Sequence, residues 1–286
     1  MPVRIITDST SEISQVEAAA LDLDVVPIKS VFADREYREG IDMMAEDFYP
    51  MLEAADILPT TSQPSPGSFE KVFREALEAG DDIVVATISS KLSGTWQSAC
   101  IAKEALVAAG VDAAANIHVI DSENTTIGLN ILMKRAIAMR DEGKSAAEIA
   151  QMLEEIKAKI RLYAVVDTLE YLHRGGRLSA AAKTAGTLLK VKPLIAVDGG
   201  EIKVVGKSRG LKKAYDEIIA LVEKSGGIDY EQPVGLGYTG DEERLDQFEE
   251  VCKDYFVGEL PPKVAIGCAI GTHVGPGAVA IAFFVK

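Results

Sequence analysis

The stretch Ile83-Val84-Val85-Ala86-Thr87 is followed by Ile88-Ser89-Ser90-Lys91-Leu92-Ser93-Gly94-Thr95, so an apolar run ends in a hydroxyl-rich loop. The apolar run is typical of a buried β-strand, and residues 94–109 after the loop read as a helix. A second pair follows, with a strand over residues 117–120 and a helix over residues 126–142. Apolar strands that alternate with helices predict an α/β fold whose parallel sheet is covered on both faces.

The same alternation runs from the N-terminus to about residue 160. Two helix starts are marked by capping residues: Ser65 precedes Pro66, and Ser145 is followed three residues later by Glu148, which is a capping box. We therefore predict an N-terminal α/β domain over residues 1–160. Its other expected elements are strands over 3–7 and 25–32, an edge hairpin or loop over 33–42, and helices near 12–21 and 45–55.

The pattern changes after residue 160. Asp198-Gly199-Gly200 separates two short apolar runs, which predicts a hairpin, and antiparallel neighbours do not belong to a purely parallel sheet. We therefore predict a second, smaller α/β domain with a mixed sheet over residues 161–286. Its expected elements are strands over 162–166, 191–197, 201–206, 233–238, 264–268 and 278–285, and helices over 178–189, 211–224 and 241–256.

Charge and cysteine content exclude several classes of function. The 30 Lys and Arg against 44 Asp and Glu give a net charge of −14, which disfavours nucleic-acid binding, since phosphate contacts need cations. The three cysteines are widely spaced, as in a reducing compartment. The first residues lack the apolar core of a signal peptide, and we expect a cytoplasmic protein.

Hydroxyl-rich loops follow several of the predicted strands. Because ligands bind beyond the carboxyl ends of parallel strands, these loops are expected to meet at one edge of the sheet. Asp8 and Asp121 are interpreted as caps or loop organisers. A hydroxyl beside glycine at a helix start offers donors and a positive dipole to a carboxylate or phosphate. The residues that the clustering favours as such an anion site are Thr61, Ser62, Ser93, Gly94 and Thr95.

Several catalytic and cofactor motifs are missing from the sequence. It contains no phosphate loop of the GxxxxGK type and no GxSxG elbow, and its three histidines lack metal-ligand spacing. Gly235-Leu236-Gly237-Tyr238-Thr239-Gly240 matches GxGxxG, but its first two glycines fall inside a predicted strand, so nucleotide binding is disfavoured. We expect no cofactor and no metal.

Motifs spread in order over the whole chain resemble the DegV family. The main ones are Thr61-Ser62-Gln63-Pro64-Ser65, Ser90-Lys91-Leu92-Ser93-Gly94-Thr95, Leu172-His173-Arg174-Gly175-Gly176-Arg177 and Gly271-Thr272-His273-Val274-Gly275-Pro276-Gly277. The resemblance implies a three-layer N-terminal domain, a two-layer C-terminal domain, and a long-chain fatty acid buried between them. It also implies a non-catalytic, fatty-acid-binding subunit of a bacterial fatty acid kinase. Such a subunit presents the carboxylate to a separate ATP-dependent kinase, which makes an acyl phosphate for phospholipid synthesis.

The resemblance also assigns roles to individual residues. It implies that Thr61 and Ser93 hydrogen-bond the carboxylate, and that His273 lies near the same head group. Arg209 fits, by position at the start of a helix, an arginine that serves docking or transfer with the kinase. Because they are apolar, segments 127–133 and 180–189 are candidates to line a tunnel for the fatty-acid chain. Apolar helical stripes of this kind more often belong to the ordinary hydrophobic core.

A second class of function stays open. Kinship with dihydroxyacetone kinases would make the chain a self-sufficient enzyme on a small carbonyl or phosphorylated substrate, which His273 would engage. The missing phosphate loop favours the lipid carrier. A carrier is also expected to make transient membrane contact when it exchanges its lipid.

Overall fold

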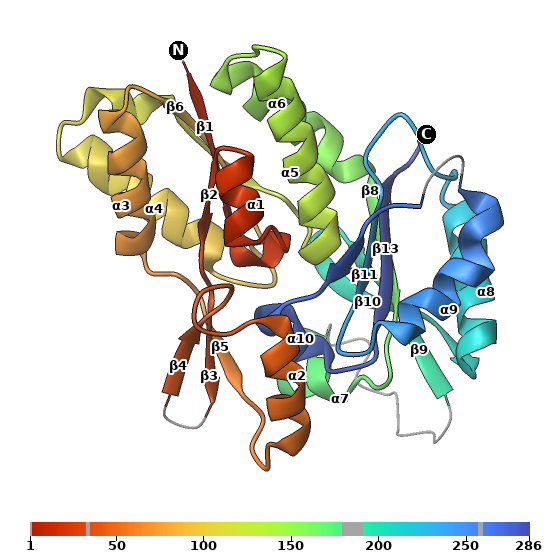
Figure 1. Cartoon of the computed structure of the whole chain (residues 1–286). Helices are drawn as coiled ribbons and strands as arrows, with labels where there is room; N and C mark the ends of the chain where they lie inside the picture. Colours follow the sequence, from red (N-terminus) through yellow and green to blue (C-terminus); the bar gives the residue numbers. More distant parts are fainter. Residues whose placement is uncertain (1, 33–34, 179–190, 257–259) are drawn as a thin grey trace.

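The computed structural model describes residues 2–32, 35–178, 191–256 and 260–286, and shows two large sheets, a small three-stranded sheet and helices around and between them (Figure 1). The first sheet has the strand order β2-β1-β6-β7, and all its pairs are parallel. Its strands are β1 (Val3–Asp8), β2 (Leu23–Val26), β6 (Asp82–Thr87) and β7 (Ile117–Asp121).

Alternate residues of these strands bury opposite faces of the sheet. Ile6 and Val85 pack with Phe69 and Phe73 of α3, whereas Val84 faces the other layer. The parallel sheet therefore lies in the middle of three layers, as predicted. Helices α3 (Pro66–Glu78) and α4 (Thr95–Ala108) cover one face, and α1 (Gln15–Ala20), α5 (Thr126–Asp141) and α6 (Ala146–Ile156) cover the other.

The second sheet is mixed and has the order β10-β9-β8-β13-β11-β12, in which only β11 and β12 are parallel neighbours. Helices α8 (Leu211–Lys224) and α9 (Glu243–Cys252) pack on one face, where Tyr215 and Phe248 meet Ile281 and Phe283. This confirms the predicted mixed sheet. The strands are β8 (Ile160–Val165), β9 (Val191–Asp198), β10 (Glu201–Arg209), β11 (Gly235–Tyr238), β12 (Lys263–Ala265) and β13 (Val279–Phe284).

Helix α5 lies between the two sheets (Figure 1), and most of its side chains are buried. Ile127 of α5 packs against Gly235 and Gly237 of β11, where a Cβ atom would come within 3.2 Å and 3.0 Å of it. The first two glycines of the GxGxxG match therefore let helix α5 pack closely against strand β11. They do not form the loop between a strand and a helix that binds a dinucleotide. Residues 127–133 are buried in this core, and none of them lines the cavity described below. The residue before them, Thr126, does line it.

The predicted single strand over 25–32 is wrong, because the chain changes sheets there. Strand β2 ends at Val26, and Pro27 follows, which has no N–H for a ladder. Ile28 donates its N–H to Ser9 Oγ at 3.0 Å. Strand β3 (Lys29–Phe32) then forms a separate sheet with β4 (Arg35–Arg38) and β5 (Thr60–Ser62), which confirms the edge hairpin.

The predicted strand over 264–268 is also wrong in part, and the glycine-rich residues that follow it, for which no helix was predicted, form one. Strand β12 ends at Ala265, and residues Cys268–Val274 form helix α10, which carries His273. The helix ends at Gly275, whose φ of 77° a side chain rarely adopts. His173 lies in a short helix, α7 (Glu170–Arg174). The helix predicted over 178–189 falls almost wholly outside the described residues. In the ranges that the structure describes, the remaining helices are α2 (Ala45–Ala54) and four short 3-10 segments, η1 (Ser9–Ser11), η2 (Asp112–Asn116), η3 (Lys157–Lys159) and η5 (Lys253–Tyr255).

Candidate functional site

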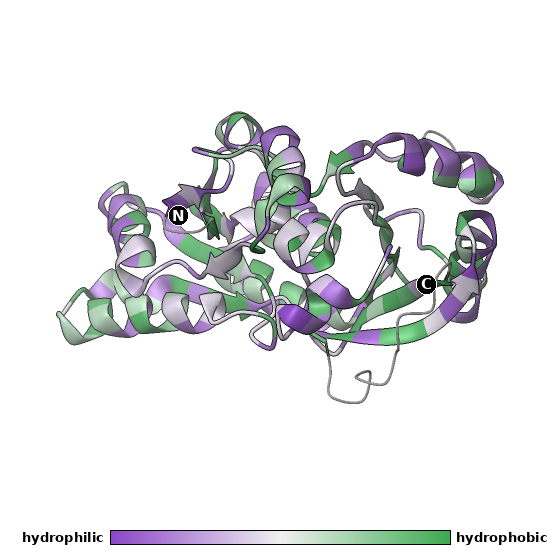
Figure 2. Ribbon diagram, turned by 90° about the horizontal axis from the view of Figure 1, so that it is seen from below, coloured by the Kyte–Doolittle hydropathy of each residue, from purple (hydrophilic) through white to green (hydrophobic). Residues whose placement is uncertain are grey.

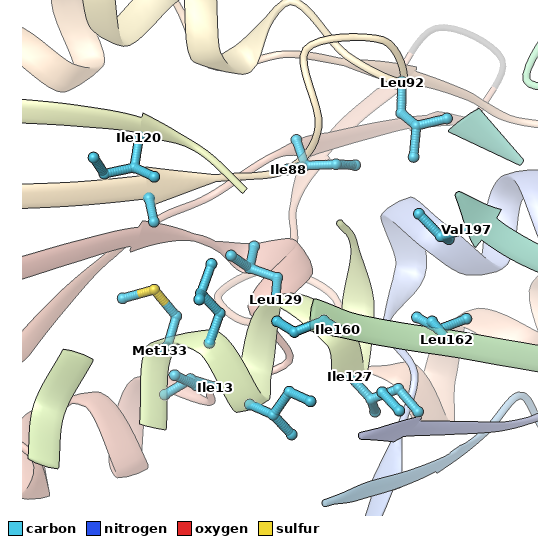
Figure 3. Close-up of a cluster of buried hydrophobic side chains, with 14 of the residues drawn as sticks. Ile13, Ile88, Leu92, Ile120, Ile127, Leu129, Met133, Ile160, Leu162 and Val197 are labelled. Atoms are coloured by element: carbon cyan, nitrogen blue, oxygen red, sulfur yellow. The ribbon is translucent and has the colours of Figure 1, made fainter. Parts of the chain in front are cut away.

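A cavity lies between the two sheets and holds about 940 Å³ of space between protein atoms, counting the part open to solvent. Most of its wall is aliphatic. Figure 3 shows how Ile88 and Leu92, from the loop after β6, lie across from Leu162 of β8 and Val197 of β9. In Figure 2 most of the length of the strands has the hydrophobic colour, whereas the outer helices carry hydrophilic stretches. Further wall residues are Ile28, Ala164, Ile195, Ile202, Ile266, Ala269, Ile270, Val274, Ala278 and Ala280.

The polar part of the wall brings together three segments that are far apart in the sequence. Thr61 of β5 places its Oγ1 2.8 Å from Nε2 of His273 in α10. Ser93, in the loop before α4, places its Oγ 2.8 Å from Oγ1 of Thr95. Thr61, Ser93 and His273 all line the cavity. An aliphatic cavity with a small set of convergent polar groups suits an amphipathic ligand.

His273 is held neutral at physiological pH. Burial and, to a smaller extent, the nearby Arg177 cation lower the pKa of its imidazole to about 4. Its ring packs against Gly175, where any side chain would overlap Nδ1. Nδ1 is buried without a hydrogen-bond partner in the described part of the chain, so the ring's polar contact is the bond between Nε2 and Thr61.

The remaining residues of the predicted anion site have different positions. Thr95 is fully buried and reaches the cavity only through Ser93, while Ser62 is exposed and outside the cavity wall. Gly94 is needed for close approach, because a Cβ atom there would overlap the carboxamide of Gln63. Gln63 lines the cavity and donates from Nε2 to Ser98 Oγ at 3.1 Å.

Arg177 is a wall residue that the sequence analysis did not select. Its Nε donates to Leu92 O at 3.2 Å and its Nη1 to Gly175 O at 2.5 Å. Among the described residues of the wall it alone carries a full positive charge, although burial lowers its pKa. The signal for it is the Arg174-Gly175-Gly176-Arg177 segment, which belongs to one of the motifs that resemble the DegV family.

Arg209 lies outside the cavity wall and does not begin a helix. It is the last residue of β10, and Gly210 separates it from α8. Its side chain is exposed, as are those of Lys207, Lys212 and Lys213 around it. These four cations lie within a stretch of seven residues in an acidic chain, and we call them the basic patch, although Lys213 also pairs with Glu217 at 3.8 Å.

The two aspartates interpreted as loop organisers have that role. Asp8 Oδ1 accepts from the Thr10 N–H at 2.9 Å, and its Oδ2 accepts from Ile88 N–H at 2.7 Å. Asp121 Oδ1 accepts from Ser90 N–H at 3.1 Å. In the described ranges no three His, Cys, Asp or Glu side chains are grouped as metal ligands, and no helix there is long and apolar enough to span a bilayer.

Comparison with known proteins agrees with this geometry. A DegV domain-containing protein of Caldanaerobacter subterraneus is 38 % identical over 282 residues, which cover 98 % of both chains. The structure of a fatty-acid-binding DegV family protein from Thermus thermophilus has a TM-score of 0.87 and 31 % identity, and covers all of both chains. A stearic-acid-binding protein from Eubacterium ventriosum has a TM-score of 0.87 and 29 % identity, over 97 % of this chain and 96 % of that one. The family model described as "Uncharacterised protein, DegV family" matches residues 2–286, and this chain therefore belongs to the DegV family.

Proposed function

We propose that this chain binds one long-chain fatty acid in the cavity between its sheets. The observation that carries the proposal is the asymmetry of the cavity wall. Aliphatic side chains from β8, β9, β13 and α10 make up most of it. Thr61 bonds His273, and Arg177 bonds the backbone of Gly175 beside His273 and of Leu92 beside Ser93, so these four residues form one polar part of the wall. Gln63, Thr10, Thr125 and Thr126 also line the cavity. Solved structures of relatives that bind fatty acids support the same ligand class.

The energetics agree with a retained lipid. A chain of palmitate length has about 14 methylenes, and at about 0.8 kcal/mol each their transfer contributes about 11 kcal/mol. Lost translational freedom and ordering of the chain remove a large part of that free energy. The remainder is compatible with a complex that survives purification.

The head group is proposed to lie against the polar part of the wall. The hydroxyls of Thr61 and Ser93 can donate to a carboxylate, and the Arg177 cation offsets its charge. A neutral His273 fits this arrangement because its Nε2 bonds Thr61 and fixes that hydroxyl. Gly94 and Thr95 act indirectly, by admitting Gln63 and by holding Ser93. Ser62 is not proposed to touch the ligand.

We further propose that the chain presents this carboxylate to a separate ATP-dependent kinase and is not itself an enzyme. Acyl-phosphate formation for phospholipid synthesis would then occur on the partner. The basic patch of Lys207, Arg209, Lys212 and Lys213 is the proposed docking surface, since local positive charge orients an acidic partner. Lipid exchange would require transient contact with a membrane, within a cytoplasmic location. The proposed domain boundary stays at residue 160, where β8 begins the mixed sheet.

Direct titration separates this function from the alternative enzyme. Protein freed of lipid is titrated with palmitate, hexadecanol and dihydroxyacetone, and heat of binding is measured. We expect tight binding of palmitate at one per chain, weaker binding of hexadecanol, and none of dihydroxyacetone. Binding of dihydroxyacetone, with no response to palmitate, would favour an enzyme on a small carbonyl substrate.

A further inference from the structure

Helix α10 is held at its start by two buried carboxyl groups from the first forty residues of the chain. Glu39 Oε1 accepts from Ala269 N–H at 2.7 Å, and Glu12 Oε2 accepts from Gly267 N–H at 2.8 Å. A helix leaves its first N–H groups unpaired, so these bonds satisfy them. They also join segments that lie 230 and 255 residues apart in the chain.

The orientation of α10 determines part of the cavity wall. Residues on one face of the helix and just before it line the cavity, and His273 is the polar member of that face. Helices α2 and α7 and strands β3 and β5 pack around α10. Tyr49 of α2 adds a hydrogen bond from its hydroxyl to Ile266 O at 2.7 Å. A shift at the start of α10 would therefore move His273 relative to Thr61.

The two carboxyl groups have unequal surroundings. Glu39 accepts on both oxygens, because its Oε2 also accepts from the Ser9 hydroxyl at 2.5 Å, which suits the ionised form. Glu12 Oε1 is buried and has no hydrogen-bond partner among the described residues, and the same holds for Oγ1 of the adjacent Thr126. This arrangement suits a protonated Glu12 whose acidic hydrogen sits on Oε1.

The surrounding titratable groups cannot balance a second negative charge. Burial raises the pKa of Glu12 well above its ordinary value, and the Glu39 carboxylate raises it further. Burial also raises the pKa of Glu39. The groups that face the pair are themselves acids, namely Asp8, Tyr49 and Cys268. Within the described chain no cation acts on either carboxyl group.

We propose that Glu12 and Glu39 are positioning residues that together carry one proton, held by Glu12, and that they hold α10 so that His273 meets Thr61. This inference rests on the proposed fatty-acid site, since it is that site's geometry which the pair maintains. Raising the pH removes the proton from Glu12 and places two negative charges side by side at the start of α10. A carboxyl that holds its proton only in the folded state stabilises the fold at low pH and loses that contribution as pH rises.

The pair can be tested on lipid-free protein through its histidines. The chain has three, so protein labelled with ¹⁵N-histidine is followed by NMR from about pH 7 to about pH 9, above the range in which His273 itself changes the stability, beside chemical denaturation. In the wild type we expect the His273 resonances and the denaturation midpoint to change together as pH rises. Glu12→Gln keeps an acceptor for Gly267 but cannot ionise, and it should abolish both changes. Glu46→Gln, at an exposed position of α2, is the matched control and should leave both unchanged.

Loss of affinity supplies the second readout. Glu12→Ala leaves the Gly267 N–H unpaired and should weaken palmitate binding by about tenfold, which corresponds to about 1.4 kcal/mol. Glu12→Gln should restore wild-type affinity near neutral pH. Wild-type pH dependence of the His273 signals in Glu12→Gln would overturn the proton assigned to Glu12, even if Glu12→Ala fails to fold. Because the NMR arm contains no lipid, a failure of palmitate binding in the wild type would count against the proposed function and not against the pair.

Discussion

Replacement of Thr61 by valine tests the head-group site with little change of shape. The substitution removes the hydroxyl that lies 2.8 Å from His273 Nε2 and faces the cavity. A hydrogen bond to a charged group contributes about 1.5–3 kcal/mol, so palmitate affinity should fall by about 10- to 150-fold. Hexadecanol has no carboxylate, and its affinity should fall by less. The affinities are measured by calorimetric titration of lipid-free protein.

The neighbouring residue supplies the control for this experiment. Ser62 precedes Gln63 on the same segment, but its side chain is exposed and outside the cavity wall. Ser62→Ala should therefore bind palmitate like the wild type. Equal losses in Thr61→Val and Ser62→Ala would refute the placement of the carboxylate, and so would an unchanged palmitate affinity in Thr61→Val. A loss that is equal for palmitate and hexadecanol would show that Thr61 only shapes the cavity.

Three further predictions follow from named contacts. Gly94→Ala should displace the Gln63 carboxamide and weaken palmitate binding several-fold, and the added change Gln63→Ala should restore much of it in the same titration. His273 has a pKa of about 4 when folded and an ordinary value of 6.5, so the unfolded chain binds its proton first as pH falls. Stability should therefore drop by up to about 3 kcal/mol between pH 6.5 and about pH 4, and urea denaturation of His273→Gln should lack this part of the drop. Arg209→Ala should leave palmitate affinity unchanged while lowering acyl-phosphate formation with the cognate kinase, and a loss of lipid affinity instead would place Arg209 at the cavity.

Local signals in the sequence predicted much of the fold. The serine caps before α3 and α6 and the Asp-Gly-Gly hairpin between β9 and β10 depend on neighbours within a few residues. The place of Ser93 in the wall could also be predicted, because parallel strands bring their following loops to one edge of the sheet. Thr61 lies in the wall for a different reason, since it belongs to β5 of the small antiparallel sheet.

Helix α10 and the role of Arg177 could not be predicted in the same way. The segment around His273 is rich in glycine, and it forms a helix because Glu12, Glu39 and Tyr49, more than 200 residues away, bond its start. Arg177 contacts Leu92 and the cavity wall only in the folded chain, because Leu92 is 85 residues away in the sequence. Its own segment therefore does not indicate this position. Tertiary contacts of this kind override local preference.

The central claim is that the cavity holds one fatty acid, and native mass spectrometry of the purified chain tests it most directly. Protein is prepared from a host that contains fatty acids, its intact mass is recorded, and the organic extract is analysed in parallel. The account predicts an added mass of one long-chain fatty acid per chain, displaced by excess palmitate and reduced in the Thr61→Val variant. A bare chain that also gains no mass on addition of palmitate would contradict it.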